Sequence, residues 1–319
     1  MKAVILAGGL GTRLRPLTYS IPKPLIPLAG KPLVRRIIDS LPSSVDTVIL
    51  AVSYMKDALE EHFQVDPCGR KVILINETTP MGTGGAIKNV AQHLDGTFIA
   101  LNGDCVSSLD LKAMVKEHRE NGGIGTIALW EVPDPSAFGV VAMDKANRIS
   151  VFQEKPKKEE ALSNLINAGA YVFEPEILDY IGKGQVSIER EVFPVILDYG
   201  LFGHRFQGFW VDCGTRENML LAQRLILERE PPEVPPEGVE CEFVQPCLVQ
   251  SRNLRCARLG PNVWVDREVK VEIGATVENS MLMKGSSVGA GSAVINSIVG
   301  PGQKVGAGQS ISDAIVASR

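Results

Sequence analysis

Acidic residues are absent from the first 38 positions of this sequence, and the first one is Asp39. The basic residues that precede it are Lys2, Arg13, Arg15, Lys23, Lys31, Arg35 and Arg36. The whole chain carries a net charge of -4, so its bulk charge gives no reason to expect nucleic-acid binding. Glycines and prolines interleave the basic residues in a way that helices do not use. The segment is therefore expected to bind an anion, against the alternative of an ordinary solvated face.

Other features are also scarce or missing. The six cysteines never occur in C-x-x-C spacing, which argues against a zinc site. No apolar run approaches the ~20 residues of a membrane span, and the short run near the start is followed by arginines, unlike a signal peptide. We therefore expect a cytoplasmic protein with reduced thiols and with no membrane or nucleic-acid partner. The histidines fall outside every motif described below and are expected to be surface or packing residues: His62, His93, His118 and His204.

The chain of 319 residues is long enough for two domains. Short apolar runs at residues 2–7, 47–52, 71–76, 97–101 and 125–131 alternate with helix-like stretches at residues 32–41, 56–63, 84–93 and 110–121. Such alternation predicts a doubly wound, mostly parallel α/β sheet with helices on both faces. Ligands bind beyond the carboxyl ends of the strands in these sheets, and Asn76, Asn102 and Asp104 lie at such ends.

The character of the sequence changes after residue 228. Residues 229–240 contain proline pairs among glutamates, which predicts a stiff linker between a first domain at 1–228 and a second at 241–319. In the second domain apolar residues recur every five or six positions, often followed by glycine: Leu259, Val265, Val271, Val277, Met283, Val288, Val294, Val299, Val305 and Ile311. This period predicts a left-handed parallel β-helix of hexapeptide repeats, in which each of these residues points into the stack.

A glycine-rich turn follows the first expected strand, at residues 8–18 (GGLGTRLRPLT). Glycines let backbone N–H groups approach phosphate oxygens, and the arginines inside the turn can bind these oxygens bidentately. Lys23 stands between Pro22 and Pro24 and adds a compact charge in an expected extended loop. The spacing is neither the G-x-G-x-x-G of dinucleotide folds nor a P-loop, which needs G-K followed by Ser or Thr. The turn therefore predicts another kind of phosphate site.

The chain resembles the nucleotidyltransferase family that makes nucleotide sugars. Besides residues 8–18 and 22–24 (PKP), the matching motifs are, in order, residues 81–87 (MGTGGAI), 102–104 (NGD), 138–141 (FGVV), 154–156 (EKP), 167–173 (NAGAYVF) and 210–215 (WVDCGT). The resemblance covers about residues 1–225, and hexapeptide tails are common in this family. It implies that a sugar 1-phosphate attacks the α-phosphate of a nucleoside triphosphate and that pyrophosphate leaves.

The resemblance also implies roles for particular residues. The nucleotide would lie against Leu6, Ala7, Gly8, Gly9, Gly11, Thr12, Gly82 and Thr83, with Arg13, Arg15 and Lys23 on its phosphates. Lys155 would hold the sugar phosphate, and Asp104 and Asp212 would bind a Mg²⁺ cofactor through carboxylate oxygens. Arg13, Lys23 and Lys155 are the expected catalytic residues, because two anions must be neutralised before they meet. The attacking phosphate is already ionised, so no general base is expected. Taken singly, an Asp after a strand is also a common turn residue, and Lys155 an ordinary surface charge.

Recognition of the sugar and of the base is expected from two further groups. Gly139, Glu154, Asn167 and Gly169 suit a sugar pocket, because carboxylates and amides bind hydroxyls and glycines admit a ring close to the backbone. Glu77 stands where the family places a side chain against the base edge. A carboxylate only accepts hydrogen bonds, which favours the two adjacent donors of guanine over the single donor of uracil or thymine. The alternatives are a turn at Asn167, a bulge at Gly139 and an exposed loop acid at Glu77.

Several substrates and other functions stay open. Residues 187–194 (SIEREVFP) and 208–215 resemble the mannose 1-phosphate guanylyltransferases, whereas residues 82–90 equally resemble the heptose 1-phosphate guanylyltransferases. Uridylyl- and thymidylyltransferases acting on glucose 1-phosphate share most of these letters. A non-catalytic nucleotide-sugar sensor would be expected to lose a metal aspartate, Arg13 or Lys23, and all are present. An acyltransferase in the hexapeptide domain would need a histidine, and none follows His204. We expect a homo-oligomer formed through the β-helix domain.

Overall fold

The computed structural model describes residues 1–230 and 236–318. By contacts between residues, the chain forms two compact units. Unit 1 comprises Met1–Gly9 and Val34–Trp210, and unit 2 comprises Leu10–Leu33 and Val211–Arg319. This division runs through the glycine-rich turn and differs from the predicted domains at 1–228 and 241–319, which stay a prediction. Residues 231–235 of the predicted linker lie outside the described residues.

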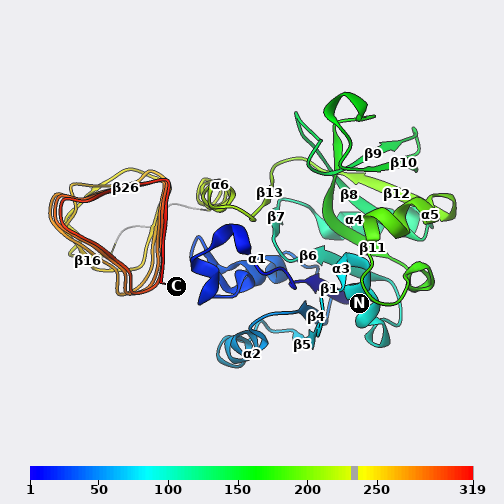
Figure 1. The fold of residues 1–319 in the computed structure, drawn as a ribbon, viewed down its shortest axis with the longest axis horizontal. Coiled ribbons are helices and arrows are strands. Elements are labelled where there is room, and N and C mark those ends of the chain that lie inside the picture. The colour runs from blue at the N-terminus through cyan, green and yellow to red at the C-terminus, as the bar shows by residue number, and fades with distance from the viewer. Residues whose placement is uncertain (231–235, 319) are drawn as a thin grey trace. The chain divides into compact units, whose positions relative to one another are not determined.

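A nine-stranded sheet forms the centre of unit 1 (Figure 1). Its strands are β1 (Lys2–Leu6), β4 (Thr47–Val52), β5 (Lys71–Asn76), β6 (Phe98–Asn102), β8 (Gly125–Glu131), β9 (Gly139–Met143), β10 (Ile149–Glu154), β11 (Leu165–Phe173) and β12 (Leu201–Arg205). Neighbouring strands β5, β4, β1 and β6 are parallel in that order, and β11 joins antiparallel to β6. Every residue of β4 is buried, as expected for a parallel strand covered on both faces. The predicted α/β sheet is confirmed.

The order of the parallel strands creates a switch point beside β1. The chain passes from β1 to β4 on one side and later to β6 on the other side, so the loops after β1 and β6 diverge. Gly8 and Gly9 follow β1, Glu77 follows β5, and Asp104 follows β6. Residues predicted to bind substrate therefore leave the sheet along one edge, at the carboxyl ends of parallel strands.

The helices are α1 (Leu33–Asp39), α2 (Lys56–Val65), α3 (Gly82–Asn89), α4 (Leu111–Asn121), α5 (Phe193–Ile196) and α6 (Arg216–Leu227). In α4, the side chain of Asp110 accepts hydrogen bonds from the N–H groups of Lys112 and Ala113, and Gly122 ends the helix in a left-handed conformation. The buried residues of α4 are three and four positions apart, so one face of the helix packs against β8, β11 and β12. The helices predicted before residue 122 coincide with α1 to α4 within a few residues.

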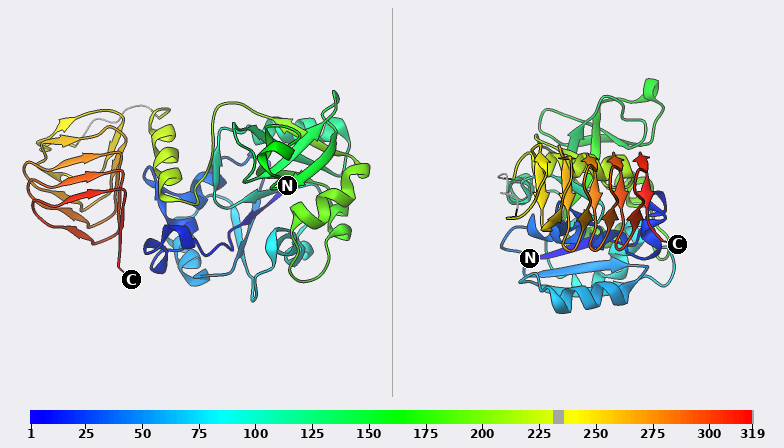
Figure 2. Two further views of the ribbon diagram at one scale, coloured as in Figure 1. Left: turned by 45° about the horizontal axis from the view of Figure 1, so that its top comes forward. Right: turned by 90° about the vertical axis from the view of Figure 1, so that its left-hand side faces the viewer.

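Three parallel sheets form the larger part of unit 2, and Figures 1 and 2 show them as the sides of a stacked coil. The first sheet contains β14 (Glu242–Phe243), β17 (Arg258–Leu259), β20 (Thr276–Glu278), β23 (Ala293–Ile295) and β26 (Ser310–Ser312). The second contains β15 (Cys247–Val249), β18 (Val263–Val265), β21 (Met281–Leu282), β24 (Ile298–Val299) and β27 (Ile315–Val316). The third contains β16 (Asn253–Leu254), β19 (Lys270–Val271), β22 (Ser287–Val288) and β25 (Lys304–Val305). This architecture confirms the predicted β-helix.

The prediction that Met283 points into the β-helix is wrong. Leu282, rather than Met283, belongs to the inner core of the β-helix. In the later coils, equivalent residues are 17 positions apart, as Val271 and Val288 show, so the three sides of these coils cannot all be six residues long. The step from Val277 to Leu282 is the short one, and a strict period of six overshoots it by one residue.

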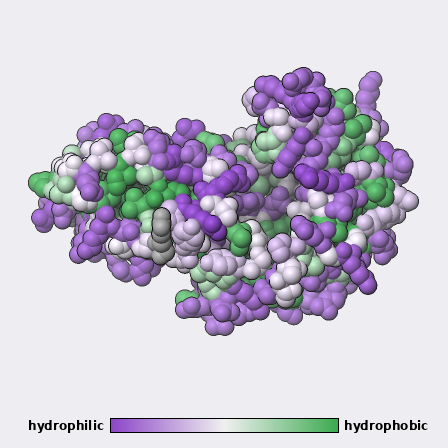
Figure 3. All heavy atoms as spheres, in the orientation of Figure 1, coloured by the Kyte–Doolittle hydropathy of each residue, from purple (hydrophilic) through white to green (hydrophobic). Residues whose placement is uncertain are grey.

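The rest of unit 2 consists of α6 and the segment Leu10–Leu33. This segment contains the 3₁₀ turns η1 (Thr12–Leu14), η2 (Leu17–Tyr19) and η3 (Lys23–Leu25), and the short hairpin of β2 (Pro27–Leu28) and β3 (Lys31–Pro32). Two further short strands are β7 (Cys105–Ser107) and β13 (Trp210–Asp212). Figure 3 shows that, on the face of the molecule in view, apolar residues gather over the β-helix. Among the described helices, none combines the length and apolar character needed to cross a membrane.

Cys241 and Cys256 form a disulfide near the start of the β-helix, with 4.7 Å between their Cα atoms. The expectation of reduced thiols is wrong for this pair. The two residues are 15 positions apart, close to the length of one coil, and so they meet across adjacent coils. The thiols are Cys68, Cys105, Cys213 and Cys247.

Candidate active site

The loop after β1 closely approaches the residue after β5. A Cβ atom at Gly8 would lie 3.0 Å from Oε1 of Glu77, a tight contact that would require the loop or the carboxylate to shift. The Ser53 hydroxyl donates a hydrogen bond to the carbonyl oxygen of Gly8 and fixes the loop. Glu77 is 8% exposed, and burial raises the pKa of its carboxyl group although the Met81 N–H donates to it. Gly8 and Glu77 therefore lie side by side, and nucleotide binding by Leu6, Ala7, Gly8, Gly9 and Glu77 stays a prediction.

Gly82 and Thr83 begin α3 and are held by a later segment of unit 1. Gly82 has a φ of 68°, and a Cβ atom there would lie 2.5 Å from the carbonyl oxygen of Val186. The Thr83 hydroxyl donates to Oε2 of Glu189 at 2.7 Å and accepts the N–H of Ile188 at 3.0 Å. Because the only hydroxyl hydrogen of Thr83 goes to Glu189, Thr83 joins two segments of the fold. Its contact with the nucleotide stays a prediction.

Glu154 ends β10, and Lys155 begins the loop after it. Burial and then the negative charge of Glu189 raise the pKa of Glu154, while the charges of Lys155 and Arg190 lower it. Lys155 is exposed, has a φ of 50°, and donates its N–H to the carbonyl of Phe138 at 3.0 Å. The arrangement places two carboxylates and two cations near one another. Such a group can bind both sugar hydroxyls and a phosphate.

Neighbouring strands bring together the four residues predicted to bind the sugar. Gly139 on β9 is the register partner of Glu154 on β10, and β9 also pairs with β11. In β11, the side chain of Asn167 accepts the N–H of Gly169 at 2.9 Å and donates to the Tyr171 hydroxyl at 2.9 Å, across an irregularity in the register. Gly139, Glu154, Asn167 and Gly169 therefore lie in adjacent strands, and part of the Asn167 amide supports the backbone.

The positively charged half of the predicted site belongs to unit 2. Gly11 has a φ of 59°, and its carbonyl accepts the Thr18 hydroxyl at 2.9 Å, which fixes the turn where Thr12 starts η1. The Arg13 guanidinium lies 3.9 Å from Oδ2 of Asp212, and the Arg13 side chain is 61% exposed. A Cβ atom at Gly214 would lie 2.2 Å from Nη2 of Arg13, so glycine in the WVDCGT motif lets the guanidinium lie this close to the backbone, and a larger residue would displace it.

Arg15 and Lys23 occupy different environments in the same segment. The Arg15 guanidinium lies over the Tyr19 ring, 5.0 Å from its centre, which is a cation–π distance. Lys23 is only 8% exposed and starts η3, with the extended Pro22 before it. The expected extended loop at Lys23 is wrong, because the fixed φ of Pro24 also suits a 3₁₀ turn.

Asp104 and Asp212 are the predicted metal ligands. The side chain of Asn218 donates to the Asp212 carbonyl at 2.7 Å, and the Thr215 hydroxyl caps α6, so a helix start holds Asp212 in place. Within the described residues, no group of three or more His, Cys, Asp or Glu could hold a metal. A pair of carboxylates nevertheless fits a hard divalent cation that takes its other ligands from phosphates and water. Asp104 lies in unit 1 and Asp212 in unit 2, and their joint action stays a prediction.

Sequence reasoning missed Glu189, Phe138 and Trp210 as individual residues. Glu189 lies in a π-helical turn (Ile188–Val192) that aims its carboxylate at Thr83. The Phe138 ring meets the Trp210 ring edge-on at 5.5 Å, and the Trp210 indole donates to the carbonyl of Ala168 at 2.8 Å. All three lie in sequence motifs of the family, and their position in these motifs is the signal that could have identified them.

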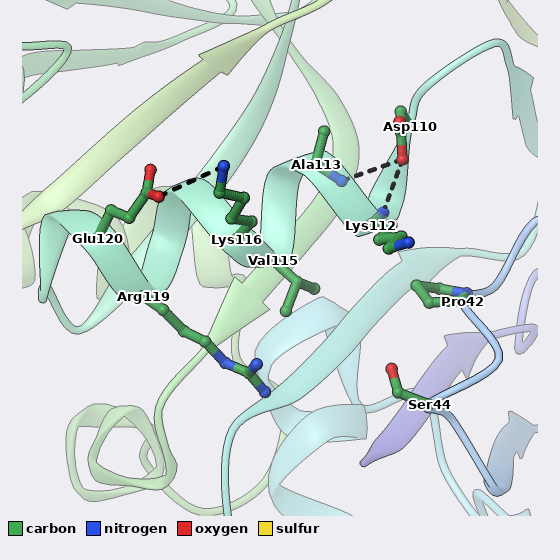
Figure 4. Close-up of a pocket in the computed structure, with 9 residues that line it drawn as sticks. All are labelled: Pro42, Ser44, Asp110, Lys112, Ala113, Val115, Lys116, Arg119 and Glu120. Atoms are coloured by element: carbon green, nitrogen blue, oxygen red, sulfur yellow. Dashed lines mark hydrogen bonds and ion pairs between the residues drawn. The ribbon is translucent and has the colours of Figure 1, made fainter.

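A cavity of about 710 Å³ lies elsewhere in unit 1, between α4 and the loop at residues 42–44 (Figure 4). Arg119 and Val115 point from α4 toward Pro42 and Ser44 in this view. The amino group of Met1 donates to the carbonyl of Ser44 at 2.9 Å, so the cavity lies near the amino end of β1, away from the carboxyl ends of the strands. None of the predicted site residues lines it. Cavity size alone therefore does not locate the site.

Comparison with known proteins agrees with this fold. The chain belongs to the nucleotidyl transferase family, whose model matches residues 2–229. The model of the GMPPB C-terminal domain matches residues 249–319. Members of the family generally use a divalent metal ion.

Several relatives carry names that specify a substrate. A mannose-1-phosphate guanyltransferase beta-B from Xenopus laevis is 40% identical over 236 residues, which are 72% of this chain and 65% of that protein. The chain thus spans just under two thirds of this relative's length. A probable mannose-1-phosphate guanylyltransferase 1 from Oryza sativa subsp. japonica is 34% identical over 300 residues, covering 90% of this chain and 82% of that protein.

Solved structures show the same fold. HddC from Yersinia pseudotuberculosis is 30% identical, with a TM-score of 0.59, and the match covers 70% of this chain and 99% of that chain. A structure of HddC complexed with GMP-PN matches at 29% identity with a TM-score of 0.58, over 70% of this chain and 99% of that chain. A UDP-glucose pyrophosphorylase complexed with UDP-glucose has a TM-score of 0.64 over 72% of this chain and 99% of that chain, but at 23% identity it indicates the fold alone.

Proposed function

We propose that this chain catalyses the Mg²⁺-dependent transfer of a guanylyl group from GTP to mannose 1-phosphate, giving GDP-mannose and pyrophosphate. The observation that carries the proposal is the similarity to the rice guanylyltransferase, which extends over 90% of the chain. The HddC structure with GMP-PN supports the choice of a guanine nucleotide. Glu77 also supports it, because a buried carboxylate beside Gly8 can accept both adjacent donors of guanine.

Charge neutralisation is the main demand of the proposed reaction, since a phosphate oxygen of one anion must attack the α-phosphorus of another. Arg13, Arg15 and Lys23 would bind the triphosphate and the departing pyrophosphate. Lys155 would hold the sugar phosphate in line for attack, which lowers the entropic part of the barrier. Asp104 and Asp212 would hold a Mg²⁺ ion that neutralises charge between the phosphates. The attacking oxygen already carries its charge, so no residue has to remove a proton.

The sugar would lie against β9, β10 and β11. Glu154 is an acceptor for sugar hydroxyls, and a Cβ atom at Gly139 would lie 3.1 Å from its Oε2, so glycine on β9 avoids crowding the carboxylate. Asn167 can offer only the hydrogen-bonding capacity that Gly169 and Tyr171 leave unused. Recognition of the mannose hydroxyls would therefore depend more on Glu154 than on Asn167.

A substrate matrix tests this proposal. Pyrophosphate release would be measured with GTP, UTP, dTTP, ATP and CTP against mannose, glucose, heptose and N-acetylglucosamine 1-phosphates, with Mg²⁺. We expect the highest kcat/KM for GTP with mannose 1-phosphate. A clear preference for heptose 1-phosphate, or for UTP or dTTP with glucose 1-phosphate, would replace the proposed substrates. Nucleotide binding without turnover in any combination would identify a sensor instead.

We also propose that the enzyme is cytoplasmic and forms a homo-oligomer through its β-helix. Ile311 and Val316, in the coil nearest the C-terminus, are only partly buried against the inner core. Covering this end with another copy would bury them further. A monomeric mass by light scattering at micromolar concentration would contradict the oligomer, and cell fractionation would test the compartment.

A further inference from the structure

One side of the β-helix carries large apolar residues on its outside. In the sheet of β15, β18, β21, β24 and β27, one residue of each apolar pair belongs to the inner core: Val249, Val265, Leu282 and Val299. Side chains alternate along a strand, so the preceding residue of each pair points outward. These outward residues are Leu248, Trp264, Met281 and Ile298, and they stand in register on neighbouring strands. We call these four residues the outer ladder.

The outer ladder is covered. Its members are between 0% and 8% exposed, although they lie outside the coil. The equivalent residues of the other two sheets are polar or small and reach solvent, as Arg258 and Lys270 do. Among the described strands of the β-helix, those of this sheet therefore carry a row of large apolar residues on the outside, suited to pack against another part of unit 2.

The segment Leu10–Leu33 provides part of this cover. A Cβ atom at Gly30 would lie 2.9 Å from Cδ2 of Leu248 and 3.6 Å from Nε1 of Trp264. A Cβ atom at Gly300, directly after β24, would lie 3.4 Å from Cδ1 of Leu17. The segment thus touches the β-helix near both ends of the outer ladder.

Helix α6 closes the same side. Gln223 is fully buried, and its side-chain nitrogen donates to the carbonyl oxygens of Asn262 at 3.0 Å and Ser280 at 3.1 Å. These carbonyls belong to the corners directly before β18 and β21. Buried hydrogen bonds of this kind fix the helix against two successive coils.

The segment on the outer ladder also bears the predicted phosphate-binding residues. Leu14, Leu17, Ile26 and Leu28 are 0% exposed, whereas the side chain of Arg13 is 61% exposed. Leu14 stands between Arg13 and Arg15, so an anchored leucine separates the two arginines. A displaced anchor would displace the charged groups beside it.

We propose that the outer ladder positions Arg13, Arg15 and Lys23, so that the β-helix contributes to nucleotide binding as well as to assembly. The expected effect on nucleotide binding rests on the proposed function, whereas the positioning of residues 10–33 by the outer ladder does not. HddC aligns over 99% of its length with only 70% of this chain, so the transferase fold does not itself require a β-helix. In the present chain, the segment Leu10–Leu33 packs against one.

Two adjacent residues of β24 give a matched test. Ile298 belongs to the outer ladder and Val299 to the inner core, and both are 0% exposed. We expect Ile298→Ala to raise both the KM and the Kd for GTP about tenfold, because small displacements of binding groups are costly, with a smaller effect on kcat. Val299→Ala should lower the melting temperature and leave both constants unchanged. The conservative Ile298→Val should restore nearly normal nucleotide binding.

Hydrogen–deuterium exchange gives a readout that does not depend on activity. Exchange of residues 10–33 should become faster in Ile298→Ala and stay unchanged in Val299→Ala, in the full-length protein below its melting temperature. Equal exchange and equal Kd in the two variants would overturn the proposal, whatever the turnover. Faster exchange in Ile298→Ala together with no turnover for any substrate pair would instead uphold the link and reject the proposed function.

Discussion

Arg13 and Asp212 lie 3.9 Å apart within unit 2, a cation predicted to bind phosphates and a carboxylate predicted to bind the metal ion. The Arg13 side chain is 61% exposed and the Asp212 side chain 29%, and a partly exposed pair of this kind is weak, so a triphosphate can draw the guanidinium away from the carboxylate. Arrival of the nucleotide would then release Asp212 for a metal ion. This order of events links the binding of nucleotide phosphates by Arg13 to the binding of the metal ion by Asp212.

The first prediction concerns the two aspartates. We expect Asp104→Asn and Asp212→Asn each to reduce kcat at least a hundredfold, because an amide oxygen binds a divalent cation far less well than a carboxylate. Nucleotide binding without metal should persist in both variants, and Asp212→Asn should not weaken it, since Arg13 loses its competing partner. Pyrophosphate release and calorimetry measure the two effects. A nearly normal kcat in either variant would remove that aspartate from the metal site.

The second prediction concerns choice of the base. Replacing Glu77 by glutamine adds a donor where guanine presents donors of its own, so kcat/KM for GTP should fall by about 10- to 100-fold. Turnover with UTP or dTTP should fall less or improve. Glu61→Gln, at an exposed acid on α2, is the matched control and should change neither. Unaltered GTP preference in Glu77→Gln would exclude Glu77 from base recognition.

The third prediction follows from the raised pKa of Glu77. The carboxylate takes up a proton at a higher pH than an ordinary glutamate, so the KM for GTP should increase as the pH is lowered toward that raised pKa. In Glu77→Gln this part of the pH profile should be flat. The stability effect has the opposite sense, because the folded state favours the protonated form and loses that stabilisation as pH rises through the raised pKa. Glu77→Gln should therefore melt higher than the wild type at neutral pH, and the difference should vanish in acid.

The fourth prediction separates the sugar phosphate from the nucleotide. Lys155→Gln should raise the KM for mannose 1-phosphate about 10-fold or more and leave the KM for GTP nearly unchanged, since a charge-assisted hydrogen bond is lost on one substrate only. Lys157→Gln is the control, because this exposed lysine lies two positions away and pairs with Glu160 at 3.5 Å. Equal effects of the two variants would assign Lys155 to general surface charge.

The fifth prediction concerns the disulfide. Thiol titration of the unfolded protein should count four thiols without reductant and six after reduction. Cys241→Ser should lower the free energy of unfolding by up to about 3 kcal/mol, the value expected for a closed loop of about 15 residues. Cys68→Ser, at a thiol in unit 1, should have little effect. Six thiols without reductant would show that Cys241 and Cys256 remain reduced.

Much of the fold can be predicted from short-range patterns. The strands at residues 47–52, 71–76 and 125–131 agree with β4, β5 and β8, because short runs of apolar and β-branched residues between turn signals mark strands. The recurrence of apolar residues every five or six positions in the second domain predicts the β-helix, because each of these residues points into the stack. Met283 shows where periodicity fails, since a coil with one short side shifts the register by a residue.

Some contacts of the candidate site can also be predicted from the sequence, and others cannot. Motif order and spacing are enough to group Glu77 with Gly8, because both follow the carboxyl ends of parallel strands of one sheet, and Glu154 with Gly139, because they lie on neighbouring strands. The hydrogen bond of Thr83 to Glu189 joins residues 106 positions apart and leaves no local trace in the sequence. The outer ladder does leave a trace, as the apolar pairs LV, WV, ML and IV on one side of the coil. A β-helix needs only one apolar residue in such a pair, so the second residue indicates a covered surface.

The boundary between unit 1 and unit 2 falls between Gly9 and Leu10. This position has a consequence for the exchange of domains between related proteins. A hybrid built by swapping everything after Leu227 would combine one protein's Leu17 and Gly30 with another protein's coils. A hybrid that keeps these contacts would have to take residues 10–33 and residues 211–319 from the same protein. These two stretches are separate in the sequence, so a single recombination event cannot exchange both. Lineages with this architecture should therefore have inherited the transferase core and the β-helix as one block, and substitutions at Gly30 or Leu17 should track those at Leu248, Trp264 and the residues around Gly300.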